Sequence, residues 1–341
     1  MLKITKKVNL NQRYLMIETL SQFIKQQYPM QDALNMCFEL FKDESLLVLM
    51  EVLKQGQPIE KYSHLLYKDD LFIEFFNFYL YRESLDEALM KAMDLCKQKD
   101  TLKNEIRKAM TYPILLLSGV MVFSIIAITY LQPQFNQFFM SFDINFTLLQ
   151  QTLMQLLFAC PFVICITFIV IGGVVLFFTK QLKSQKFNEL EKWFHYPIFN
   201  QILKKYISIK FCLYYKEFLY LGYDLHTILN MISQKIMDSH LQMVAFELIE
   251  EVKNGKDISE ILDQFMYFDR HFKLIFKLSL SHQTPFTLFE QYYKTSIMLV
   301  KMTTHKFIQG VLPVLYGFIG VYIIGVYCGM ILPMMNMLDK L

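Results

Sequence analysis

Residues 111–179 read TYPILLLSGVMVFSIIAITYLQPQFNQFFMSFDINFTLLQQTLMQLLFACPFVICITFIVIGGVVLFFT, and Asp143 is their only side chain that is charged at neutral pH. Residues 113–132 and 156–179 are two apolar runs that can each cross a membrane, because a bilayer core takes about 20 residues as helix. Residues 133–155, between them, contain Gln, Asn and Ser but no Lys or Arg. The sequence therefore predicts transmembrane helices at 111–132 and 156–179, joined by a short loop at 133–155.

Positive charge flanks this stretch on both sides. The flanking residues are Lys97, Lys99, Lys103, Arg107 and Lys108 before it, and Lys180, Lys183, Lys186 and Lys192 after it. Loops rich in Lys and Arg stay on the cytoplasmic side of a membrane. We therefore expect a multi-pass plasma-membrane protein with its N-terminus in the cytoplasm and residues 133–155 outside.

The composition limits the classes of function. The chain is 54% apolar and 19% charged, which suits a protein that is part membrane and part cytoplasmic. The net charge is only +3, and Lys alternates with Asp and Glu, so direct nucleic-acid binding is not expected. The six Cys form no CxxC pair and the N-terminus has no apolar signal core, so neither a disulfide framework nor a cleaved signal is expected.

Residues 1–110 show the apolar periodicity of helices. Gly56 followed by Pro58 indicates the end of one helix, and further helices are expected at 69–82 and 85–109. No strand-like alternation is present, so this segment is predicted to be an all-α bundle. Its buried faces are indicated by an apolar and an aromatic stripe: Met30, Ala33, Leu34, Cys37, Phe38 and Phe41, then Phe72, Phe75, Phe76 and Tyr79.

The second half repeats features of the first at a nearly constant spacing, which two copies of one unit explain. The repeat predicts a second cytoplasmic bundle at 180–310, a third transmembrane helix at 311–335 and an outer tail at 336–341. The helix at 156–179 would connect the copies, and the prolines would start or interrupt membrane helices. The matching pairs are Gly56 with Gly255, Glu83 with Gln283, Pro113 with Pro313, and Pro133 with Pro333, which lie 199, 200, 200 and 200 positions apart.

Motifs for catalysis are missing from the sequence. The single Gly-Lys pair, Gly255-Lys256, is followed by Asp257 and forms no phosphate-binding loop, and the seven His never form HExxH. We therefore expect no enzyme activity, cofactor or metal site. The three spans carry no ionisable group, which argues against the alternative of a small membrane transporter.

The third span contains a GxxxG pattern at Gly325 and Gly329. Small residues at this spacing let helices approach closely in lipid. The pattern favours a helix contact within or between subunits, although Gly is also tolerated in membrane helices without such a contact.

Three motifs give the chain a resemblance to the F-type family of type II secretion, the inner-membrane platforms of secretion, type IV pilus and competence systems. They are RKAMTYPI at 107–114 with Tyr112 and Pro113, QPQF at 132–135 with Pro133 and Phe135, and ILPM at 331–334 with Pro333. The family's Gly-Glu-x-x-Gly element keeps only Glu83 in the first copy and becomes His282-Gln283-Thr284-Pro285 in the second, so the chain departs from the family there. Its size and composition look most like the competence pseudopilus platforms of ComGB type.

The resemblance implies a non-enzymatic platform in the cell membrane. Such a platform would engage a cytoplasmic assembly ATPase, receive pilin-like (pseudopilin) subunits and form a homo-oligomer. It would support DNA uptake in competence (transformation). A platform for protein secretion or for type IV pilus biogenesis is the nearer alternative.

The charge pattern makes a topology prediction. An Asn136→Cys variant is expected to react with a membrane-impermeant thiol reagent in intact cells, because residue 136 lies in the predicted outer loop. A Lys186→Cys variant is expected to react only after the cells are opened. Protection at position 136 together with labelling at position 186 in intact cells would reverse the topology.

Overall fold

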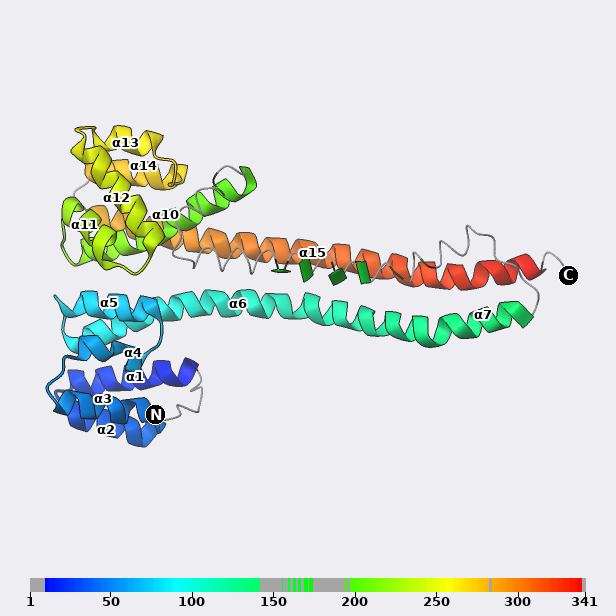
Figure 1. The fold of residues 1–341 in the computed structure, drawn as a ribbon, viewed down its shortest axis with the longest axis horizontal. Helices are drawn as coiled ribbons and strands as arrows, with labels where there is room; N and C mark the ends of the chain where they lie inside the picture. The colour runs from blue at the N-terminus through cyan, green and yellow to red at the C-terminus, as the bar shows by residue number, and fades with distance from the viewer. Residues whose placement is uncertain are drawn as a thin grey trace. The chain divides into compact units, whose positions relative to one another are not determined.

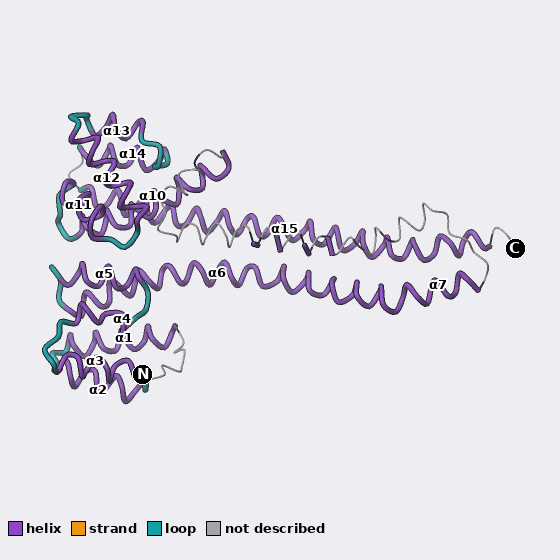
Figure 2. The backbone as a smooth tube through the Cα atoms, in the orientation of Figure 1, coloured by secondary structure: helices purple, strands orange, loops and turns teal. Residues whose placement is uncertain are grey.

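The computed structural model describes residues 10–141, 194, 197–281 and 284–338, with isolated positions between 155 and 173. The described residues are helices joined by short loops and contain no strand (Figure 2). They divide into two compact units, Met1–Lys103 with Gln185–Ile297 and Asn104–Ser184 with Met298–Leu341. The predicted all-α class is confirmed for this part of the chain.

The first bundle, residues 10–103, follows the sequence signals closely (Figure 1). Its apolar stripe after Pro29 lies on α2, where Ala33, Leu34 and Cys37 are buried. The aromatic stripe lies on α5, where all four rings are buried, and Gly56 ends α3 with a φ of 74°. The elements are α1 (Leu10–Lys25), α2 (Met30–Phe41), α3 (Glu44–Lys54), η1 (Ile59–Tyr62), α4 (Ser63–Leu66), α5 (Asp70–Leu80) and the start of α6 (Leu85–Ile126).

The second bundle, residues 197–297, has helices in a corresponding order. Asp69 and Asp269 each accept a hydrogen bond from the first turn of the helix that follows, and a cap of this kind is worth about 1 kcal/mol. Gly255 ends α12 with a φ of 80°, as Gly56 ends α3. The elements are α10 (Pro197–Tyr220), α11 (Leu225–Lys235), α12 (Ser239–Lys253), α13 (Ile258–Gln264), α14 (Arg270–Leu280) and the start of α15 (Pro285–Leu338).

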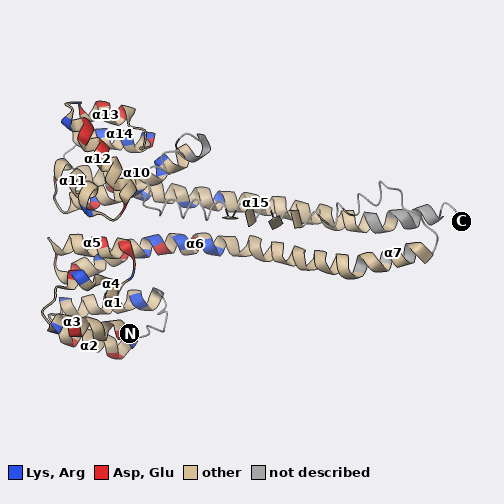
Figure 3. Ribbon diagram, viewed as in Figure 1, with Lys and Arg blue, Asp and Glu red and all other residues tan. Residues whose placement is uncertain are grey.

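The last helix of each bundle continues into a long apolar segment. Pro113 lies inside α6 and Pro313 inside α15, so neither proline begins or ends a helix. A proline removes one hydrogen bond, at a cost of about 3 kcal/mol, and the uninterrupted helix on both sides outweighs this loss. Charged side chains lie on the bundles and on the first part of α6 and α15, and the later parts carry none (Figure 3).

The helical path after α6 differs from the prediction. A π-helical turn, η2 (Ala127–Leu131), leads into α7 (Gln132–Ser141), which contains Pro133 and Phe135. Residues 133–141 of the predicted outer loop are thus helical, and their place outside the membrane stays a prediction. Pro133 has no N–H to donate, and the wider π turn before it accommodates the interrupted hydrogen-bond ladder.

Two helices of the described chain are long and apolar enough to cross a membrane, Leu85–Gln134 and Pro285–Cys328. Only 12% and 17% of their most apolar windows are buried within the protein, unlike the core helix of a soluble domain. Most of the predicted helix at 156–179 and the rest of the predicted loop lie outside the described residues. Of the predicted tail, residues 336–338 still belong to α15.

The first apolar part of α6 and the matching part of α15 lie side by side. Lys301 forms an ion pair with Glu105 at 2.6 Å, and the hydroxyls of Tyr112 and Tyr316 are hydrogen-bonded. Phe123 then packs edge-on against Tyr322, with 6.3 Å between ring centroids. Because the contacts advance along both helices together, α6 and α15 run in the same direction.

Candidate functional site

The candidate site is the contact between the two bundles, where α5 meets α10. Its centre is aromatic. The Phe75 ring stacks on Tyr214, and the Phe78 ring packs edge-on against Phe218, with 4.9 Å between centroids in each pair. Ring pairs of this geometry contribute about 0.5–1.5 kcal/mol each beyond their buried area. These rings therefore hold the bundles together.

Two buried carboxylates lie inside this aromatic contact, one on each bundle. The Tyr79 hydroxyl of α5 donates to Glu217 of α10 at 2.7 Å, and the Tyr214 hydroxyl of α10 donates to Glu74 of α5. Glu74 and Glu217 are only 6% and 8% exposed, so each depends on a donor from the other bundle. The two pairs are reciprocal and lock α5 against α10.

Each carboxylate has a further partner on the second bundle. Glu74 also accepts a hydrogen bond from the backbone N–H of Met237, in the turn between α11 and α12. Glu217 also pairs with its neighbour Lys216, whose ammonium lies 5.2 Å from the centre of the Tyr293 ring. A charge that has left water needs such partners, because one without them is strongly destabilising.

Burial sets the protonation of these groups. It raises the pKa of Glu74, and the hydrogen bonds from Tyr214 and Met237 offset only part of that rise. Burial, reinforced by the neighbouring carboxylates, also raises the pKa of Tyr79 and of Tyr214. Both phenols therefore stay protonated and act as hydrogen-bond donors.

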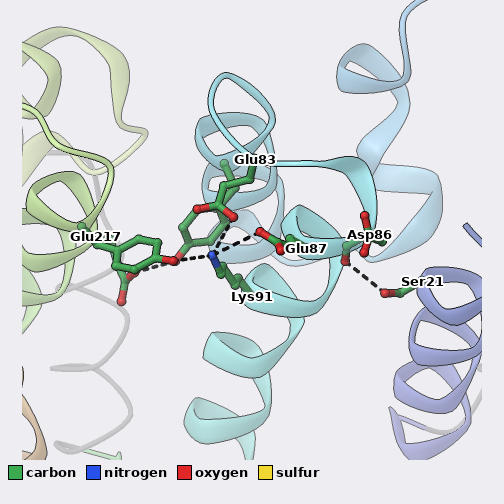
Figure 4. Close-up of polar contacts among 8 residues, drawn as sticks. Ser21, Glu83, Asp86, Glu87, Lys91 and Glu217 are labelled. Atoms are coloured by element: carbon green, nitrogen blue, oxygen red, sulfur yellow. Dashed lines mark hydrogen bonds and ion pairs between the residues drawn. The ribbon is translucent and has the colours of Figure 1, made fainter. Parts of the chain in front are cut away.

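A polar rim borders the aromatic centre, where the turn between α5 and α6 meets the end of α10 (Figure 4). The Lys91 ammonium lies 2.6 Å from Glu83 and 2.8 Å from the Tyr220 hydroxyl. A hydrogen bond shared with Glu87, followed by the contact with Lys91, lowers the pKa of Glu83. Lys91 thus supplies the positive charge beside Glu83.

Arg82 fastens the same rim to the second bundle. Its guanidinium donates to the carbonyl oxygen of Leu221 and lies 4.3 Å from the centre of the Tyr223 ring. Between them, Gly222 has a φ of 77°, and a Cβ there would lie 3.0 Å from the Arg82 guanidinium. Glycine suits this position, because a side chain here would adopt a strained conformation and would require the Arg82 guanidinium to shift.

Comparison with known proteins finds a distant similarity to a ComG protein. No protein-family model matches the chain. The chain is similar to ComG operon protein 2 of Bacillus subtilis (strain 168). The two sequences are 20% identical over 262 residues, which cover 75% of this chain and 80% of the relative. The similarity to a ComG protein supports the resemblance to ComGB-type platforms at this distant level.

The similarity to ComG operon protein 2 extends over 75% of the chain and assigns no role to single residues, so the places of these residues come from the structure. Of the family-motif and packing residues singled out from the sequence, only Glu83 lies at the contact between bundles, where Phe75 and Tyr79 of the predicted aromatic stripe also lie. The others lie along the long helices: Tyr112 and Pro113 on α6, Pro133 and Phe135 on α7, and Pro313, Gly325, Gly329 and Pro333 on α15. The helix contact expected at Gly325 and Gly329 stays a prediction.

The central residues of the contact were missed from the sequence. Glu74 and Glu217 each stand in a run of aromatic residues, FIEFFNFY and YYKEFLY, where a lone carboxylate is unusual. A carboxylate in such a run indicates a buried group that needs a hydrogen-bond donor, but the sequence does not indicate which residue supplies it. Among the described residues, no group of three or more His, Cys, Asp and Glu is arranged to hold a metal ion.

The reciprocal pairs predict the effect of removing a hydroxyl. Tyr79→Phe and Tyr214→Phe are each expected to lower the free energy of unfolding by about 1–3 kcal/mol, because each leaves a buried carboxylate short of a donor. Urea unfolding of the full chain in detergent would measure this change. Tyr81→Phe, at a ring that is 75% exposed, is the matched control and is expected to have no effect. Equal stability of all three variants and the wild type would contradict the assignment.

Proposed function

We propose that this protein is the membrane platform of a competence pseudopilus. In this role it couples a cytoplasmic assembly ATPase to the assembly of pilin-like subunits, and it performs no catalysis itself. Both bundles lie in the cytoplasm, α6 and α15 enter the cell membrane, the C-terminus lies outside, and several copies associate. The similarity to ComG operon protein 2 supports the assignment to competence.

The observation that carries the proposal is the continuity of bundle and membrane helix. Helix α6 runs from Leu85 to Ile126 and α15 from Pro285 to Leu338, so each bundle ends in a helix that is also a candidate membrane span. A continuous helix is stiff over this length, although each internal proline removes one of its backbone hydrogen bonds. A displacement of a bundle is thereby passed along α6 or α15 without the helix unfolding.

The bundle contact adds a second element to the coupling. The pairs Tyr79–Glu217 and Tyr214–Glu74 fasten one bundle to the other, so force applied to either reaches both. The common order of helices and the similar placement of Gly56 and Gly255 support the inference that the bundles are copies of one unit. Two joined copies would move α6 and α15 together.

Two alternative functions, a small membrane transporter and a platform for another secretion or pilus system, have less support than a competence platform. A small membrane transporter needs ionisable or polar groups that converge at membrane depth, and residues 113–132 and 313–332 contain no charged side chain or His. A platform for protein secretion or for type IV pilus biogenesis would share the same architecture. The ComG similarity favours competence over these two.

Deletion of the gene tests the function. We expect loss of pseudopilin from the cell surface and loss of transformation, while the purified partner ATPase still hydrolyses ATP, because the platform transmits motion and supplies no catalytic group. A plasmid copy of the gene should restore both phenotypes. Wild-type pseudopilin and wild-type transformation frequency in the deletion strain would reject the platform role.

The stiffness of α6 is tested by an insertion after Lys108, between the bundle and the apolar segment. A flexible Gly-Ser insertion of seven residues is expected to abolish transformation while the protein still accumulates in the membrane. The matched control is an Ala-rich insertion of the same length, which adds about two helical turns and keeps the helix stiff and in phase. It should retain more activity, and equal activity of both insertions would contradict mechanical coupling through α6.

A further inference from the structure

The second bundle carries a groove that the proposed coupling leaves unused. It lies between α12 and α13, encloses about 530 Å³ and continues along the residues that follow α13. Apolar side chains, among them Phe246, Ile261 and Met266, form part of its lining. Phe246 is 50% exposed and Met266 is 40% exposed, so the groove offers an aromatic ring and a flexible thioether to an incoming side chain.

The rest of the lining is acidic. Four carboxylates line the groove against a single cation: Glu247, Glu250, Glu251 and Glu260, with Lys256. Glu250 pairs with Lys253 at 3.0 Å, and Glu251 pairs with Lys256. These pairs are exposed and contribute little, about 0–1 kcal/mol each, so an incoming cation can displace them. The groove therefore presents apolar surface surrounded by an excess of negative charge.

The first bundle lacks this acidity at the corresponding positions. The two bundles can be matched here because Gly56 and Gly255 both have positive φ values, and η1 and α13 begin at Ile59 and Ile258. On this match, 199 positions apart, the residues in place of the four carboxylates are Val48, Glu51, Val52 and Lys61. Only one of these is acidic, so the four carboxylates of the groove are not matched at these positions of the first bundle.

We propose that this groove is the docking surface for a Lys- or Arg-rich segment of the cytoplasmic ATPase, with one bulky apolar side chain inserted between Phe246 and Met266. The proposal rests on the proposed function, which places the second bundle in the cytoplasm with that partner. We choose a basic segment as the occupant because of charge complementarity: four carboxylates around an apolar patch attract cations and repel acidic segments. The ATPase thus acts on the second bundle, and the buried Tyr–Glu pairs pass the force to the first.

A photocrosslinking amino acid tests the occupant. We would place it at Phe246 in the full chain, in cells that make the ATPase, and at Leu47 as the matched control, since Leu47 is the counterpart of Phe246 and is 42% exposed. Position 246 is expected to crosslink to a basic peptide of the ATPase, identified by mass spectrometry, and position 47 is not. Crosslinks from position 246 only to residues 180–192 of the same chain, only to a second copy, or to nothing would overturn the proposal.

Charge reversal supplies an independent measurement. Glu250→Lys with Glu260→Lys is expected to lower the crosslink yield from position 246 at least about tenfold, because like charges at a contact are strongly repulsive. Glu51→Lys, the counterpart change in the first bundle, should leave the yield unchanged. If the deletion abolishes transformation but the charge-reversed protein supports wild-type transformation, the docking proposal alone fails. If the deletion has no effect, the proposed function fails.

Discussion

Two carboxylates in an aromatic contact are the constraint on which the arrangement of the bundles depends. Glu74 and Glu217 are buried where Tyr214 and Tyr79, each from the opposite bundle, donate to them. Separation of the bundles would remove both donors and expose the stacked rings to water. The contact is therefore stable only when its buried carboxylates keep their hydrogen-bond donors.

Under the proposed function, this requirement also bears on the long helices. A stiff helix transmits a displacement only if its base is held firmly, and the base of α6 lies beside the contact through Glu83 and Lys91. Arg82 also holds the turn after α10, where Gly222 leaves room for its guanidinium. The charged rim thus fixes the position from which α6 starts, and the apolar half of the helix follows from there.

The two bundles share an order of helices but differ in surface chemistry. In the second bundle, α12 and α13 carry the acidic groove, whereas the matching part of the first bundle has Val48, Val52 and Lys61 in place of three of its carboxylates. A common order is what the proposed duplication would leave, because buried positions must keep their packing. Exposed positions are free to differ, and on the docking proposal this freedom would let one bundle bind a partner that the other does not.

The sequence by itself determined the helices, the apolar segments and the core faces, because these depend on local periodicity, caps and turn residues such as Gly56 and Gly255. It did not determine that α6 continues through Pro113 or that residues 133–141 are helical, since a single proline is a weaker signal than the helix around it. The contact of Glu74 with Tyr214 and of Glu217 with Tyr79 joins residues about 140 positions apart. Only the tertiary structure decided those partners. A carboxylate in an aromatic run indicates that a hydrogen-bond donor is needed, but the local sequence does not specify which residue the fold brings to it.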